Sequence, residues 1–448
     1  MPYTVGKFTV GLSRGGESLT IDQNTIIKVT MTEDIFQSCM IGTLHFRDSV
    51  GYTEKFEITG FDPVSISYRE EDIDVTKHFM VYDFNRIRSN NQGTPADITM
   101  MWHLIEIPFI YMNHHKYSKS WINKTGSDII EEICKNMCLI EPYTIPVTQM
   151  RTNMAVGSDF APPSTDLSPN VPAHFFNLFE KSLEKFEYFY MPYWCPLEAI
   201  RWLMRRSSGV ESQTSGYLFF SNARGYNFVT LETLIKSKER ELDRYGGAVV
   251  YINLGVSDEF NNILNWSINP TDMHSHKYLA GRTMKGFNFD NKELLDITHT
   301  YEDGIDEYTL LGKSSLFPNI SKTNTNFTME CESDPDIMDN IFYNDFIKRY
   351  SKQFSMTMEV RGHSRRYAGM IIDVLWKSAF SKEVTNKMYA GLYLVRSITH
   401  QFTPGTETVP NYKQTMVCLK TGYGSDDVSG LYQTAKGKSI VAEGISKV

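Results

Sequence analysis

Two cysteines stand four residues apart, at Cys134 and Cys138, in a segment whose apolar spacing predicts a helix. Thiols with that spacing lie on one helix face. With His114, His115 and Glu131 nearby, they are ligand types that zinc prefers. Cysteine is also among the most frequently buried residue types, and two small apolar side chains on the inner face of a helix have the same spacing. We favour this second interpretation and predict no metal site here.

Two other segments contain residues that bind metals or phosphates elsewhere. His274 and His276 could form a ligand pair, but no third ligand stands at a suitable distance, so we expect solvated histidines. Residues 311–314 read LGKS, as in the end of a phosphate-binding loop. That motif requires a glycine five positions before its Gly-Lys pair, and Glu307 stands there. We therefore predict no metal and no cofactor.

Candidate catalytic patterns are equally incomplete. Residues 11–15 read GLSRG, but a nucleophile elbow needs a strand before it and a helix after it. The sequence that follows is typical of a strand, so we expect a glycine-rich turn. The carboxylate runs at 70–72 and 330–332 are typical of solvated loops, and spacing alone does not identify a glycosidase pair. We predict no catalytic residue and no enzymatic activity.

Two arginine pairs and a dense aromatic set remain. We interpret Arg205-Arg206 and Arg365-Arg366 as interface or rim positions rather than nucleic-acid contacts. Large apolar aromatic patches mark interfaces, so we expect a core plus a subunit-contact face from the aromatic set. Its members are Phe175, Phe176, Phe179, Phe186, Tyr188, Phe189, Tyr190, Tyr193 and Trp194.

Composition limits the class of protein that could hold these residues. With 448 residues the chain should form two to four domains, and 41% hydrophobic residues suffice for a sizeable core. A net charge of −8 argues against a protein that grips nucleic-acid phosphates. Six scattered cysteines favour reduced thiols, and we expect neither a signal peptide nor a membrane span.

Residues 1–112 and 249–421 both read as β. Short segments rich in Val, Ile, Thr, Phe and Tyr alternate with turn clusters, a spacing typical of sandwiches and barrels. We predict strands at 25–31, 41–46, 64–68, 79–85 and 98–104, and again at 261–268, 281–290, 292–300, 354–361, 369–376, 391–402 and 412–420. A helix at 334–350 interrupts the second region, with Asp334 as N-cap and Pro335 in its first turn.

The middle region, 113–248, reads as a compact α/β domain. Residues 125–128 provide N-cap types before a helix, and further helices are predicted at 175–186 and 196–206. The aromatic runs within 216–228 surround a polar turn and predict a β-hairpin. Residues 422–448 are small, polar and weakly patterned, so we expect a flexible C-terminal tail.

The two β regions resemble each other in order. The first has IIKVTMTEDIF and IGTLHFRDS, and the second has ILNWSINPTDM and AGRTMKGFNFDN: a strand, an acidic turn, then a strand after a glycine. PVSISY, HFMVYDFNRIR and DITMMWHL then correspond to GMIIDVLW, GLYLVRSITHQF and YKQTMVCLK. Any two antiparallel domains share some such patterns, but the shared order favours a duplication. Three chains with two similar barrels each would make a ring of six units.

The sequence resembles the central baseplate hub proteins of contractile-tailed phages, a module that also forms the N-terminal part of type VI secretion spike proteins. Four passages, at 31–68, 196–235, 263–290 and 354–402, carry the resemblance, which extends over residues 20 to 420. Family members often have a proline in the turn of the fourth passage, where this chain has Arg-Arg-Tyr-Ala-Gly. No lysozyme-like or β-helical extension is present, so any needle should be a separate polypeptide.

The resemblance implies a β-dominated α+β fold with two tube-type β-barrels, an α/β domain and smaller inserted elements. It implies a homotrimer whose pseudo-sixfold ring joins the trimeric central spike to the hexameric tail tube and contacts the wedge proteins. DNA would pass through the lumen without sequence-specific binding. The expected location is the baseplate of a virion, after assembly in the host cytoplasm.

Three alternatives stay open at this point: a hydrolase of the tail tip that degrades the cell envelope, the hub of a secretion or bacteriocin device, and a receptor-binding protein of the tail-fibre type.

Overall fold

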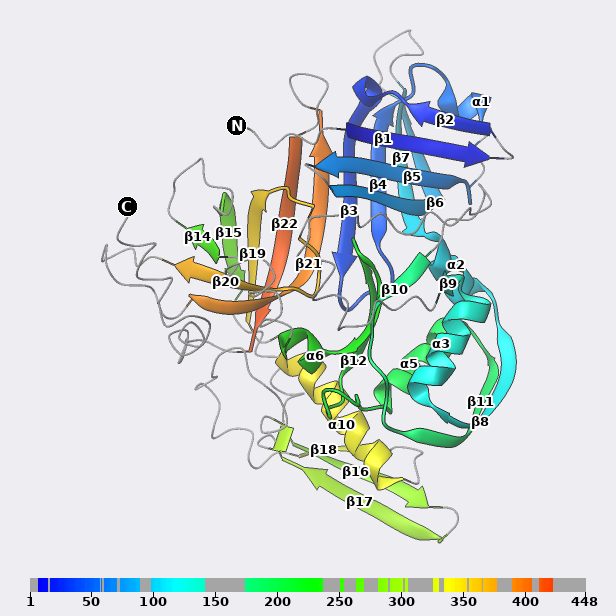
Figure 1. Cartoon of the computed structure of the whole chain (residues 1–448), viewed down its shortest axis with the longest axis vertical. Helices are drawn as coiled ribbons and strands as arrows, with labels where there is room; N and C mark the ends of the chain where they lie inside the picture. The colour runs from blue at the N-terminus through cyan, green and yellow to red at the C-terminus, as the bar shows by residue number, and fades with distance from the viewer. Residues whose placement is uncertain are drawn as a thin grey trace.

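The computed structural model confirms a β-dominated α+β fold (Figure 1). Among the described residues, no helix combines the length and apolar character that a membrane crossing requires. The domain boundaries proposed from the sequence remain predictions. The structure describes residues 7–421 apart from 15–16, 57, 59, 71–72, 89–97, 142–173, 237–249, 254–262, 270–280, 289–290, 301–302, 305–324, 330–333, 353, 365, 377–388 and 405–410.

The first β region forms one half of a large twisted sheet. Its five central strands lie in the order β3, β4, β7, β6, β5, all antiparallel, and β1 and β2 continue beyond β5. Alternating apolar residues bury one face of each strand. The bounds are β1 Lys7–Arg14, β2 Glu17–Ile21, β3 Ile26–Asp34, β4 Ile41–Arg47, β5 Pro63–Glu70, β6 Ile73–Arg88 and β7 Ile98–Glu106, with short helical turns η1 Gln23–Thr25 and α1 Tyr52–Lys55.

The second β region repeats that strand order. Its five central strands run β15, β19, β22, β21, β20, again antiparallel, and β14 adds to β20 in parallel. Each strand therefore has a counterpart: β3 with β15, β4 with β19, β7 with β22, β6 with β21 and β5 with β20. The bounds are β14 Val250–Asn253, β15 Asn265–Asn269, β19 Phe354–Arg361, β20 Ile371–Trp376, β21 Gly391–Thr403 and β22 Asn411–Lys420.

This strand order supports the duplication, but one of the strand correspondences predicted from the sequence is wrong. The sequence pattern pairs the segment at 281–290 with β4, but this segment forms β16 (Gly281–Asn288) in a separate sheet with β17 (Glu293–His299) and β18 (Thr325–Met329). β19 occupies the place of β4 instead, after an insertion in the chain. A strand preceded by a glycine is too short a pattern to distinguish the two.

The two regions join into a single 13-stranded sheet through β3 and β21. The residues of β21 up to Leu394 pair with β20, whereas Ser397–Phe402 pair with β3. A β-bulge at Arg396 separates the two halves, and bulges bend strands locally. The end of β21 thus inserts Phe402 into the core of the first region, where its ring lies 4.9 Å from that of Phe8 and 5.0 Å from that of Tyr68.

The middle of the chain packs below this sheet in Figure 1. A four-stranded sheet runs β12, β13, β10, β9, and a two-stranded ribbon pairs β8 with β11. Helices α3 and α5 pack against each other within their core. The bounds are α2 Ile107–His114, β8 Tyr117–Thr125, α3 Gly126–Met137, β9 Ile140–Glu141, β10 His174–Phe179, β11 Lys185–Trp194, α5 Pro196–Arg205, β12 Tyr217–Asn222, β13 Gly225–Thr230 and α6 Leu231–Lys236.

Most elements predicted here are confirmed. Thr125 caps α3 by accepting from the Asp128 amide, and the hairpin of β12 and β13 turns between Asn222 and Gly225. The helix predicted at 175–186 is wrong, because this segment forms β10 and the start of β11. Its phenylalanines match helical spacing, but aromatic residues also favour strands, and β10 is held between β13 and β9.

One further prediction is wrong, since Gly11 and Ser13 lie within β1 rather than in a turn. A Cβ on Gly11 would stand 2.8 Å from Ser65 Oγ on the neighbouring strand β5, so close strand approach explains this glycine.

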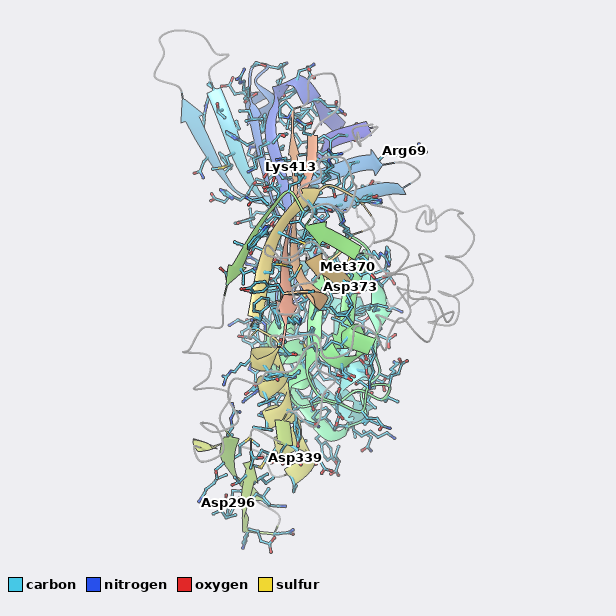
Figure 2. The ribbon with its side chains drawn as sticks, turned by 90° about the vertical axis from the view of Figure 1, so that its left-hand side faces the viewer. Arg69, Asp296, Asp339, Met370, Asp373 and Lys413 are labelled. Atoms are coloured by element: carbon cyan, nitrogen blue, oxygen red, sulfur yellow. The ribbon has the colours of Figure 1, made fainter. Side chains whose placement is uncertain are left out.

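Helix α10, Pro335–Tyr350, has the predicted Asp334 cap and packs its apolar face against β12 and the β16–β17–β18 sheet. Figure 2 shows Asp339 of α10 and Asp296 of β17 at the end of the molecule opposite Arg69 of β5, with Met370 and Asp373 between them.

The packing of Phe402 makes the first prediction. Phe402→Ala should lower the free energy of unfolding by about 3–5 kcal/mol, because it leaves a cavity in the core shared by both β regions. Chemical denaturation measures this. Phe287→Ala, at a side chain that is 41% exposed, should cost clearly less. Equal costs for the two variants would contradict the shared core.

Candidate functional site

Three distant parts of the chain meet at the carboxylate of Glu33, which is completely buried at the end of β3. Its Oε2 accepts a hydrogen bond of 2.6 Å from the Ala223 amide, in the turn of the β12–β13 hairpin. Its Oε1 accepts one of 3.0 Å from the Ala368 amide, just before β20. One side chain thus joins the first β region, the α/β region and the second β region. We call this the Glu33 junction.

A polar network extends the Glu33 junction through the second region. His400 of β21 places Nε2 3.3 Å from Glu33 Oε1, and its Nδ1 lies 2.6 Å from the hydroxyl of Tyr412. The Gln414 amide nitrogen donates to that same hydroxyl at 2.9 Å and to the His363 carbonyl at 2.9 Å. All of these groups are buried, so each hydrogen bond avoids a large desolvation cost.

A second buried carboxylate, Glu106 at the end of β7, binds the same hairpin. It accepts hydrogen bonds from the Met40 amide at 2.9 Å, the Ser221 hydroxyl at 2.8 Å and the Tyr226 hydroxyl at 3.1 Å. Burial raises the pKa of Glu106, and the positive charge of Lys77 partly offsets this increase. Burial lowers the pKa of Lys77, because it disfavours the charged form of that group too. The Lys77 ammonium donates a hydrogen bond of 2.6 Å to the Asn222 carbonyl.

These two buried carboxylates have a structural role, because their hydrogen bonds hold separate segments of the chain together. Both oxygens of Glu33 and both oxygens of Glu106 accept hydrogen bonds from the protein itself. A general acid or base needs to reach a substrate proton, and these carboxylates are directed into contacts between segments. Their arrangement holds the β12–β13 hairpin against both β regions.

The residues weighed as zinc ligands are not brought together. Cys134 and Cys138 lie in the apolar core of the α/β region, whereas His114 and His115 are exposed and Glu131 pairs with Lys181 at 2.9 Å. Burial raises the pKa of the Cys134 thiol, with its neighbour Cys138 adding to the effect. Among the described residues, no group of three His, Cys, Asp or Glu side chains could hold a metal ion.

Several other candidates lie outside the described residues: His274, His276, residues 311–314, the acidic run 330–332 and most of the run 70–72. The predicted tail, 422–448, lies outside them too.

The rim interpretation is wrong for two of the arginines. Arg206 is 8% exposed with its guanidinium 4.0 Å from the Trp202 ring, and Arg366 is 3% exposed and donates to Gln414. Both are therefore part of the packed interior. Arg205 forms an ion pair with Asp345 at 3.0 Å, which Arg282 shares, and Arg365 is not described.

The aromatic set divides into a buried part, as expected, and an exposed part whose role in subunit contact stays a prediction. Phe176, Phe186 and Phe189 are buried in the α/β core. Tyr188, Tyr190 and Tyr193 are more than 60% exposed on the outer face of β11, which is the face available for contacts.

The sequence pattern does not predict the Glu33 junction, because the acidic pair Glu33-Asp34 is typical of a turn after a strand. The residue instead continues the buried alternation of β3, after Val29 and Met31. A carboxylate at an inward position of an otherwise apolar strand is a signal of a buried polar contact.

Comparisons with known proteins agree with this fold. No protein-family model and no curated sequence matches the chain. Among solved structures, a tail protein from Neisseria meningitidis MC58 aligns with TM-score 0.54 and 8% identity over 92% of this chain and 96% of that one. The 43 kDa tail protein of prophage MuSo2 from Shewanella oneidensis aligns with TM-score 0.52 and 11% identity over 93% and 99%.

A type VI secretion component, the E. coli c3393 protein, reaches a TM-score of only 0.45 at 10% identity over 94% and 78%, and adds nothing to the fold assignment. The chain therefore has the fold of phage tail proteins along nearly its whole length, as the sequence resemblance predicts.

The Glu33 junction makes the second prediction. Glu33→Ala should lower the free energy of unfolding by about 2–6 kcal/mol, because it leaves the buried Ala368 amide and the partly buried Ala223 amide without acceptors. Glu33→Gln keeps one acceptor oxygen and should cost less. The control Glu54→Ala, at an exposed side chain, should change stability by no more than about 0.5 kcal/mol. A neutral result for Glu33→Ala would refute the junction.

The third prediction concerns pH. Burial, together with the nearby Lys77 and His78, lowers the pKa of His174 to about 3. Its Nε2 is buried with no hydrogen-bond partner among the described residues. The unfolded chain binds a proton there near pH 6.5, whereas the folded chain does not until about pH 3. As the pH is lowered from 6.5 toward 3, the free energy of unfolding should therefore decrease. Relative to pH 7, this loss should be at most about 3 kcal/mol at pH 4.

His174→Phe should reduce this loss, as measured by denaturation at pH 7 and pH 4. His115→Phe, at an exposed histidine, should leave it unchanged. Identical pH dependence of wild type and His174→Phe would contradict the assignment.

Proposed function

We propose that this chain, with its tail-protein fold, is the structural hub of a contractile-tail baseplate. Three chains would form a ring of six similar β units. Its threefold side would bind a trimeric central spike, and its six-unit side would bind the hexameric tail tube. The chain would belong to the baseplate of a virion, assembled in the host cytoplasm.

The duplication within the chain is the observation that carries this proposal. The two five-strand units share strand order, antiparallel pairing and the position of a bulge. A trimer of a duplicated unit has six similar units around its axis, so a single protein can contact partners of threefold and sixfold symmetry. A chain with only one unit could not do this as a trimer.

The partners follow from the same arrangement. Wedge proteins would contact the outer surface, and the exposed face of β11, with three tyrosines more than 60% exposed, offers one such surface. DNA would leave through the lumen of the ring. Three chains carry three times the net charge of −8, which disfavours retention of phosphates and suits sliding rather than sequence-specific binding.

A non-catalytic role agrees with the use of the buried carboxylates. Glu33 and Glu106 hold the three regions of the chain together through hydrogen bonds within the protein. The hub would act by subunit contacts and shape alone.

The fourth prediction follows directly. Light scattering on the purified protein should give a particle three times the 51.5 kDa chain mass. Images of that particle should show a ring with an open centre. A monomer at every accessible concentration, or a closed dimer, would contradict the hub proposal.

A further inference from the structure

Two strands at opposite sides of the molecule have an edge that pairs with no strand among the described residues (Figure 1). One is β15, which pairs only with β19. The other is the second half of β6, after Tyr82: its first half pairs with β5, but residues 83–88 pair only with β7. Side chains there are exposed, Tyr82 by 52% and Phe84 by 38%. Unpaired strand edges are templates for strand addition.

The counterparts of these two edges already pair with each other inside the chain. β15 corresponds to β3, and β6 corresponds to β21. The second half of β21 pairs with β3, and this is the contact that joins the two β units.

The local geometry of β6 and β21 is the same to the level of single hydrogen bonds. The β6–β7 register shifts at Tyr82, and the β21–β22 register shifts at Arg396. Just before these bulges, Val81 exchanges two backbone hydrogen bonds with Phe61 and Asp62, at 2.6 and 3.0 Å.

In the second unit, Val395 exchanges the same two bonds with Gly369 and Met370, at 2.8 and 2.9 Å. Phe61 and Gly369 even share a positive φ, of 62° and 97°. A backbone shaped alike at both positions presents its outer edge in the same way.

From this equivalence we infer a specific contact between two copies of the chain: the second half of β6 in one copy pairs antiparallel with β15 of the next. This inference rests on the proposed ring and names the strands that close it. The contact joins unlike surfaces, so it repeats from copy to copy and forms a ring when its rotation closes. In a trimer, three β3–β21 contacts within chains would alternate with three β6–β15 contacts between chains.

The internal contact also sets the register. Thr32 pairs with Thr399, and their hydroxyl oxygens lie 3.1 Å apart. Following the ladders strand by strand, Thr399 corresponds to Asn85 and Thr32 to Asn269. Asn85 of one copy should therefore lie opposite Asn269 of the next. Two asparagine amides at that position can hydrogen-bond as the two threonines do.

Cysteine cross-linking tests this register. The five described cysteines are buried, and Cys331, which is not described, is replaced by serine in every variant. Oxidation of Asn85→Cys/Asn269→Cys should convert monomer bands into covalent dimers and trimers. Asn85→Cys/Ser267→Cys places the second thiol on the same face two residues away and should cross-link much less. Thr32→Cys/Thr399→Cys reports the same geometry within one chain and should shift only the monomer band.

Light scattering on the same samples separates the possible failures. An assembly of three chains in which Asn85→Cys/Asn269→Cys does not cross-link, or in which Asn85→Cys/Ser267→Cys cross-links better, would overturn the inferred contact while leaving the hub proposal intact. A protein that stays monomeric would overturn both. Dimers formed by Asn85→Cys alone would indicate a symmetric contact and would also overturn the inference.

Discussion

The pairing of β3 with the second half of β21 is the contact on which the rest of the structure depends. It turns two separate β units into one sheet, and it brings Phe402 of the second unit into the core of the first. The buried Glu33 at the end of β3 stabilises this contact by accepting hydrogen bonds from the β12–β13 hairpin and from the segment before β20. A buried carboxylate is costly to desolvate, so it persists only where several donors compensate that cost.

The bulge at Arg396 allows one strand, β21, to pair along its length with two different strands, β20 and β3. Before it, β21 pairs with β20; after it, the strand bends and pairs with β3, while the Arg396 guanidinium binds the Asp34 carboxylate at 3.1 Å. The first unit has the same bulge at Tyr82, although no described strand occupies the corresponding place beside β6. In the inferred ring, this edge of β6 would pair with a neighbouring chain.

Local patterns in the sequence predicted the elements with strong local signals. The helix α3 follows a capping threonine, α10 follows Asp334 and Pro335, and the β12–β13 hairpin has a polar turn between aromatic runs. The duplication was also visible, because the strands of both units keep their order along the chain. The helix prediction for residues 175–186 was wrong because clustered phenylalanines fit a helix and a strand equally. Only the pairing of β10 with β13 and β9 decides between them. The Glu33 junction joins residues as far apart as Glu33 and Ala368, and no local pattern contains such a contact.

If the inference is right, the internal junction and the contact between chains are copies of each other. An electron cryomicroscopy reconstruction of the assembled particle, at a resolution that traces strands, tests it most directly. We expect six strand junctions around the axis that superimpose on one another, alternating between β3–β21 within a chain and β6–β15 between chains. Chains that meet through other surfaces, or junctions between chains that cannot be superimposed on the internal one, would contradict it.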